Sequence, residues 1–146
     1  MKLFHQTKTE HIIIVGCGLL GSALAAGFAE TNSHVTLIDR NRNAFAALPD
    51  NFTEDILAGD GTDEEILKQA QVQSCDIFFA VTGDDNTNLM AAQVAKTCFG
   101  VKKVFARVDD ASKAPAYGPA GITAVSSPLL LCREFRKALG EEEASA

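Results

Sequence analysis

The sequence predicts an α/β domain in which a doubly wound parallel sheet carries helices on both faces. Segments typical of buried strands alternate with helical segments along the chain, as in parallel sheets. In addition, residues 11–22 read HIIIVGCGLLGS, so a β-branched strand runs into glycines at the G-x-G-x-x-G spacing and then into a helix. Six such strands predict a single Rossmann-like sheet in the order 3-2-1-4-5-6.

Composition limits the functional classes. The 146 residues are 47% hydrophobic and carry a net charge of −6, which suits one domain with one core. There is no basic stripe for nucleic acid and no apolar run near the roughly 20 residues that span a bilayer, so we expect neither nucleic-acid binding nor direct membrane insertion. We expect a soluble, cytoplasmic domain over 11–140, between a polar N-terminal tail (1–10) and a disordered acidic tail (141–146).

The glycine turn has a separate task for each glycine. Gly16 allows the tight turn, Gly18 allows a pyrophosphate to approach the backbone, and Gly21 allows the helix to pack on the strand. The helix that follows points its free N–H groups at the phosphates. Cys17 has two interpretations: a reactive thiolate favoured by the helix N-terminus, or a small residue at a variable position, which we favour.

The second strand, residues 34–38, ends at Asp39. An acidic residue about 20 positions beyond the glycines binds the adenosine ribose hydroxyls in dinucleotide folds. The alternative is an aspartate that only caps the strand end. A carboxylate here also disfavours a 2′-phosphate, so NAD or another adenine nucleotide is preferred over NADP, although Arg40 weakens that preference.

The loops that follow the first four strands share one edge of the predicted sheet. They carry the glycine turn, Asp39, Asp60 and Thr82–Asp85, and we expect a ligand where these loops converge. The other expected elements are a helix over 41–48, a strand over 54–58, a helix over 64–70, strands over 76–81 and 103–108 with a helix over 89–98 between them, a strand over 121–125 and a helix over 128–139.

Two helices, 89–98 and 129–139, are more apolar than a helix covering a sheet requires. Two interpretations stay open: a subunit interface, or deeper burial within one domain. The four cysteines are far apart and form no C-x-x-C pair. We therefore expect no metal site and interpret the cysteines as small buried apolar residues.

The motifs together resemble the RCK domain, also called the KTN or TrkA N-terminal domain, of Trk and Ktr potassium-uptake systems and some potassium channels. The resemblance covers residues 11–130. It is carried by GCGLLGSALA, LID ending at Asp39, AGDGTDEEIL, DIFFAVTGDDNTNLMAAQVAK and VFARVDD.

The resemblance implies a regulatory subunit and not an enzyme. Such domains form dimers and rings on the inner face of the membrane, attached through a membrane potassium transporter or channel subunit. They bind NAD/NADH or ATP/ADP, and the ligand changes the conformation that gates the partner. The resemblance therefore implies a cytoplasmic homo-oligomer that is peripheral to the membrane.

By position, the resemblance implies that Gly16–Gly21 hold the phosphates and Asp39 the ribose. Asp60 and Gly61 would border the adenine, and Thr82–Asp85 would close the far side. No catalytic residue is expected. The expected nucleotide-binding residues are Gly16, Cys17, Gly18, Leu19, Leu20, Gly21, Asp39, Arg40, Gly59, Asp60, Gly61, Val81, Thr82, Gly83, Asp84 and Arg107.

Arg107 has two interpretations: a residue that reaches a terminal phosphate, or a solvated charge at a strand end. Three features depart from the family pattern. Leu19 stands where many members have arginine. Ser127-Pro128-Leu129 stands where the family often has Ser-Pro-Glu, so leucine replaces the glutamate. The family's C-terminal regulatory lobe is also missing, which we expect to mean either a single-lobe regulator or a piece of a longer chain.

Two other functions fit the glycine turn. An NAD-dependent oxidoreductase needs a substrate-binding region and a placed acid or base, and Tyr117 is the only tyrosine and lies in a loop. A methyltransferase-like binder of adenosylmethionine shares the first turn and the acidic residue after the second strand. That class does not account for Thr82–Asn88.

Overall fold

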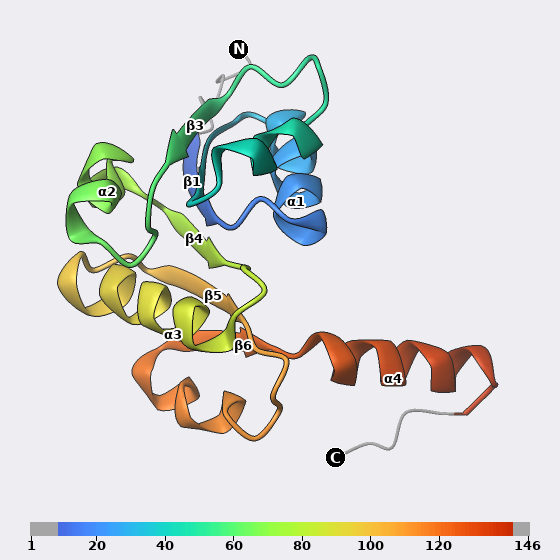
Figure 1. Cartoon of the computed structure of the whole chain (residues 1–146). Coiled ribbons are helices and arrows are strands. Elements are labelled where there is room, and N and C mark those ends of the chain that lie inside the picture. Colours follow the sequence, from blue (N-terminus) through green and yellow to red (C-terminus); the bar gives the residue numbers. More distant parts are fainter. Residues whose placement is uncertain (1–8, 142–146) are drawn as a thin grey trace, which may run out of the picture.

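The computed structural model describes residues 9–141 and contains one parallel sheet in the order β3-β2-β1-β4-β5-β6 (Figure 1). This confirms the predicted fold class and strand order. Most of each predicted tail, residues 1–8 and 142–146, lies outside the described residues. Glu10, which we assigned to the N-terminal tail, already belongs to the first strand.

The elements lie close to the expected ones. The strands are β1 (Glu10–Val15), β2 (Ser33–Asp39), β3 (Asp55–Ala58), β4 (Ile77–Ala80), β5 (Lys103–Arg107) and β6 (Ile122–Val125). The α-helices are α1 (Leu19–Ala29), α2 (Glu64–Gln69), α3 (Asp85–Gln93) and α4 (Ser127–Ala138). Short helical segments complete the described chain: the 3₁₀ segments η1 (Arg42–Ala47), η2 (Val72–Ser74), η4 (Ala114–Ala116) and η5 (Gly118–Ala120), and the π-helical segment η3 (Val94–Cys98).

Two predicted helices differ from the structure. The segment 41–48 is a 3₁₀ helix, started by the Asn41 side chain, which accepts a hydrogen bond from the Asn43 N–H. The helix predicted over 89–98 begins earlier, at Asp85, because the Asp84 carboxylate accepts a hydrogen bond from the Thr87 N–H and caps it. Its last turn is a π-helix.

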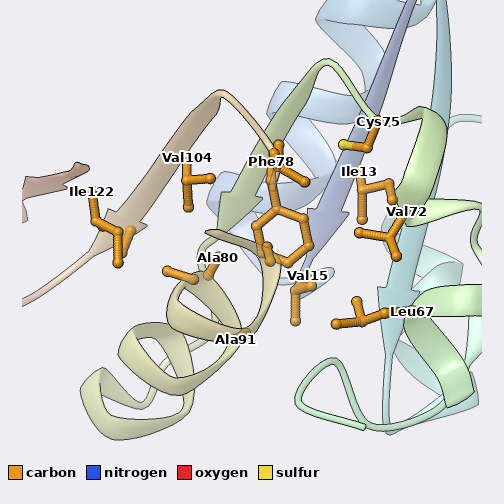
Figure 2. Close-up of a cluster of buried hydrophobic side chains, with 14 of the residues drawn as sticks. Ile13, Val15, Leu67, Val72, Cys75, Phe78, Ala80, Ala91, Val104 and Ile122 are labelled. Carbon is orange, nitrogen blue, oxygen red and sulfur yellow. The ribbon is translucent and has the colours of Figure 1, made fainter. Parts of the chain in front are cut away.

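The sheet separates two hydrophobic cores. Ile13 and Val15 of β1 face α2 and α3, where they join Phe78, Leu67 and other buried side chains (Figure 2). The alternate residues of β1, Ile12 and Ile14, face α1 and η1 on the other side. Strand β1 is therefore buried on both faces, which explains its unbroken run of β-branched residues.

The end of β1 is the tightest point of the fold. Gly16 has a φ of 106°, which L side chains rarely adopt, and a Cβ there would lie 2.9 Å from the Thr82 backbone nitrogen. A Cβ at Gly21 would lie 1.7 Å from the Gly16 carbonyl oxygen. The first turn of α1 therefore rests directly on the turn that leaves β1.

The two helices with surplus apolar residues behave differently. On α3, Leu89, Ala91 and Ala92 are buried within the domain, so deeper burial explains this helix. Helix α4 has no buried residue and projects away from the sheet (Figure 1). Its Phe135 is 69% exposed. Among residues 9–141, no helix combines the length and apolar character needed to cross a membrane.

The cysteines also divide into two kinds. Cys17 and Cys75 are buried as expected, and burial raises the pKa of the Cys75 thiol to about 12. Cys98 and Cys132 are exposed, so the expectation of burial is wrong for these two residues. They lie on the last turn of the α3 segment and on α4, where sequence periodicity cannot show which side lacks a neighbour.

Two glycines of α1 give a matched test of the tight contact. Gly21→Ala is expected to lower the free energy of unfolding by at least about 3 kcal/mol, because the new methyl group overlaps a backbone carbonyl. Gly27→Ala meets nothing within 4 Å and is expected to raise it by roughly 0.5–1 kcal/mol through helix propensity. Urea unfolding followed by circular dichroism measures both; equal stability of the two variants would contradict the account.

Candidate functional site

A cavity of about 330 Å³ lies at the carboxyl edge of the sheet. Four strands contribute to it, because β1, β2, β3 and β4 all end there. Its lining is Val15, Gly16, Ile38, Asp39, Arg40, Gly59, Asp60, Gly61, Thr82, Gly83, Asp84 and Thr87. The size falls within the usual range of small-molecule sites, and the position is where open α/β sheets bind ligands.

The start of α1 provides hydrogen-bond donors beside this edge. Gly18 is the residue before the first helical residue, and no side chain caps the helix there. The N–H groups of a first helical turn have no partner within the helix, and the helix dipole makes them attractive to anions. Helices α2 and α3, in contrast, are capped by Asp63 and Asp84.

Neither the backbone conformation nor a contact within the described domain requires glycine at position 18. Its φ of −82° is accessible to any residue, and a Cβ there would meet nothing within 4 Å. A side chain would instead occupy free space next to the N-terminus of α1. This free space matches the close approach to the backbone that a pyrophosphate requires.

Asp39 is fixed at the end of β2 by backbone donors. Its Oδ2 accepts a hydrogen bond from the Cys17 N–H at 2.8 Å, and its Oδ1 accepts one from the Asn41 N–H at 2.8 Å. The carboxylate therefore ties the glycine turn to β2 and also lines the cavity. The two interpretations of this residue, a cap and a ligand-facing group, are structurally compatible.

Asp60 connects two loops of the site. Its Oδ1 accepts hydrogen bonds from the Thr62 N–H and hydroxyl at 2.9 and 2.7 Å, and its Oδ2 accepts one from the Arg40 guanidinium. Burial opposes ionisation of Asp60, but these hydrogen bonds outweigh it and hold the pKa of Asp60 below its usual value. The carboxylate and the guanidinium both line the cavity as a charged pair.

Asn88 organises the loop that follows β4. Its Oδ1 accepts hydrogen bonds from the Thr82 N–H and hydroxyl at 2.8 and 2.6 Å. Its Nδ2 donates to the carbonyl oxygens of Thr82 and Arg107 at 3.0 and 2.9 Å. The side chain is fully buried and every polar atom has a partner, so it locks the cavity loop to the end of β5.

Two residues of the first turn of α3, next to this loop, were absent from the expected site. Asn88 belongs to the family-like motif, but sequence spacing does not show which polar residue turns inward. Thr87 lines the cavity, and its N–H and hydroxyl donate to Asp84 at 2.8 and 2.6 Å. These hydrogen bonds lower the pKa of Asp84. The signal for Thr87 was the capping pattern of an aspartate followed three residues later by a donor.

Several predicted site residues lie outside the cavity. Leu19 is 94% exposed, and Gly21 lies beneath the glycine turn. Cys17 is buried, and burial together with the nearby charge of Asp39 raises the pKa of its thiol. This environment supports the small-residue interpretation of Cys17 and opposes a reactive thiolate.

A second, apolar groove of about 450 Å³ is lined by the predicted residues Leu19, Leu20, Val81 and Arg107, whereas Gly18 lines neither this groove nor the cavity. It lies between α1, the ends of β4–β6 and α4, and it is lined by Leu19, Leu20, Leu24, Phe79, Val81, Phe105, Ala106, Arg107, Val125, Ser127, Leu130 and Leu131. The Arg107 Nε donates to Asp109 Oδ1 at 3.0 Å. Arg107 would have to exchange this carboxylate for a phosphate in order to bind a nucleotide.

Sequence comparison matches the chain to a known domain family and to curated relatives. Residues 12–128 match the TrkA-N domain family. The Trk system potassium uptake protein TrkA of Streptomyces coelicolor is 38% identical over 117 residues, which is 80% of this chain and 52% of that protein. The chain thus spans about half the length of this curated relative.

Solved structures share the fold. The TrkA-N domain of the inner membrane protein ybaL from Escherichia coli has a TM-score of 0.78 at 16% identity, covering 90% of this chain and 97% of that one. The GsuK channel bound to NAD has a TM-score of 0.77 at 24% identity, covering 91% of this chain and 24% of that one. With the family match over residues 12–128, the chain belongs to the TrkA-N (RCK) domain family, which its sequence motifs resemble.

Proposed function

We propose that the protein is a regulatory domain that binds an adenine nucleotide, NAD(H) or ATP/ADP, in the carboxyl-edge cavity and gates a membrane potassium transporter or channel. The observation that carries the binding site is Gly18, whose free space and uncapped helix N-terminus suit a phosphate. A relative named as a potassium uptake protein supports the regulatory context.

The cavity and the glycine turn that adjoins it divide over the parts of an adenine nucleotide. The turn Gly16–Gly21 and the start of α1 would hold the phosphates, and Asp39 would accept hydrogen bonds from the ribose hydroxyls. Asp60 and Gly61 would border the adenine, and the Thr82–Asp84 loop would close the far side. The carboxylates are already anchored by backbone donors, so little ordering would accompany binding.

A sensor fits the cavity better than an enzyme does. Within residues 9–141, the cavity lining includes no histidine, cysteine, lysine or tyrosine side chain. The pKa values of Asp60 and Asp84 are lowered, so these carboxylates are ionised near neutral pH and are poor proton donors. Binding without catalysis is the function that these groups support.

A ligand gates a partner only if it binds one conformation better than another. Hydrogen bonds connect the cavity to α4: Asn88 joins the loop after β4 to the Arg107 carbonyl, and the Val108 N–H donates to the Val125 carbonyl at 2.9 Å. Helix α4 follows Val125 directly. We propose that nucleotide contacts at the cavity loop change the direction of α4 through this path.

The protein is expected to act at the inner face of the membrane, attached through its potassium-transporting partner, and to work as a homo-oligomer. Exposed apolar side chains such as Leu131 and Phe135 on α4 support self-association, because apolar surface in contact with water is costly. The apolar groove beside α4 is continuous with this surface, since Leu130 and Leu131 line it.

Gly18→Val tests nucleotide binding without disturbing the fold. The variant should keep the melting temperature of the free protein, because a Cβ at this position meets nothing within 4 Å and the side chain begins in open space. A nucleotide at 100 times its Kd should raise the wild-type melting temperature by roughly 5–10 °C and leave Gly18→Val unchanged. Thermal melts with NADH, NAD, ATP and ADP measure this, with Gly27→Ala as the control. Flat wild-type melts with all four nucleotides would refute the proposal.

Phe135→Glu tests self-association through α4. Light scattering after size-exclusion chromatography should show a dimer or larger assembly for the wild type and a monomer for the variant, because a charge on this apolar face opposes burial. Met90→Glu changes an exposed apolar residue of α3 and should leave the assembly intact. A monomeric wild type, or loss of assembly only in Met90→Glu, would contradict the proposed surface.

A further inference from the structure

Two neighbouring residues have opposite effects on whether the site accepts a nucleotide with a 2′-phosphate. Asp39 is the carboxylate that accepts hydrogen bonds from a free ribose 2′-hydroxyl and repels a 2′-phosphate. Arg40 directly follows, and an arginine near this position is how dinucleotide folds accommodate a 2′-phosphate. The outcome therefore depends on whether the guanidinium is free to meet the ligand.

In the structure the guanidinium is held by Asp60. The Arg40 Nη2 donates to Asp60 Oδ2, and both residues line the same cavity. The Arg40 side chain is 71% exposed and that of Asp60 is 30% exposed, so the pair lies at the mouth of the cavity and not in its floor. A bound 2′-phosphate would have to compete with Asp60 for this cation.

The two oxygens of Asp60 have separate tasks. Oδ1 accepts hydrogen bonds from the Thr62 N–H and hydroxyl and holds the loop after β3, while Oδ2 holds Arg40. Asparagine can keep the first task through its carbonyl oxygen. Its amide group, however, is a donor that cannot pair with a guanidinium.

We infer that Asp60 is a specificity-determining residue: by pairing with Arg40, it keeps the site selective for adenine nucleotides with a free 2′-hydroxyl. This inference rests on the proposed nucleotide site and concerns which nucleotides that site rejects. Asp39 rejects a 2′-phosphate by its own charge, and Asp60 removes the cation that would offset that charge.

The matched ligands 5′-AMP and adenosine 2′,5′-bisphosphate differ only in the 2′-phosphate. Isothermal titration calorimetry at fixed ionic strength gives the ratio of their Kd values for each variant. The wild type should prefer 5′-AMP. Asp60→Asn should shift the ratio toward the bisphosphate by about tenfold, because a charge-assisted hydrogen bond to Arg40 becomes available. The double variant Asp60→Asn/Arg40→Gln should lose that shift.

Two further variants test whether the effect depends on the pair of Arg40 and Asp60. Asp63→Asn removes a neighbouring charge that caps α2 outside the cavity, and it should leave the wild-type ratio unchanged. Arg40→Gln leaves the Asp60 loop intact but removes the cation that pairs with Asp60, so it should shift the ratio toward 5′-AMP by no more than about fivefold, the scale of one exposed charge. This variant tests the inference even if Asp60→Asn fails to fold.

The outcomes separate the inference from the proposed function. A wild type that binds neither ligand overturns the inference, and flat melts with NADH, NAD, ATP and ADP would overturn the proposed nucleotide site as well. A wild type that binds 5′-AMP, with an unchanged ratio in folded Asp60→Asn, overturns the role of Asp60 and leaves the nucleotide site standing. A large loss of bisphosphate binding in Arg40→Gln alone would show that the guanidinium is free in the wild type, and would also overturn the inference.

Discussion

The structure depends on a close approach of backbone to backbone at the end of β1. Gly21 leaves no room for a side chain above the Gly16 carbonyl, and Gly16 leaves none beside Thr82. On the other side, a Cβ at Gly61 would lie 2.3 Å from a methyl group of the Val15 side chain. Three loops therefore converge on one strand end at distances that only glycine permits, and this contact brings α1, β3 and β4 to the same edge of the sheet.

The loops that meet at this edge are also held in place by side-chain hydrogen bonds within the domain. Each loop is closed by its own carboxylate: Asp39 holds the glycine turn, Asp60 the loop after β3, and Asp84 the start of α3. All three side chains also line the cavity. In the proposed site, local structure and ligand recognition would thus be carried by the same groups, so a substitution at these positions is expected to affect loop geometry and binding together.

Much of the fold could be predicted because buried parallel strands have an unmistakable composition and the chain order of βα units fixes the topology. The sequence did not predict which elements pack against one another or which distant side chains form hydrogen bonds. Segments 89–98 and 129–139 have similar apolar content, yet the first forms a buried helix and the second a projecting helix, since the pattern of a helix does not identify what covers it. The hydrogen bonds of Asn88 and the pairing of Arg40 with Asp60 likewise join residues distant in sequence.

The central claim is that an adenine nucleotide binds at the carboxyl edge with its phosphates at the start of α1. A titration of ¹⁵N-labelled protein with NADH, followed by amide chemical shifts, tests it most directly. The account predicts the largest changes at the amides of Gly18, Gly61 and Gly83, around the cavity and the uncapped helix N-terminus. Largest changes at Phe105 and Val125 in the apolar groove, or none at saturating NADH, would contradict it.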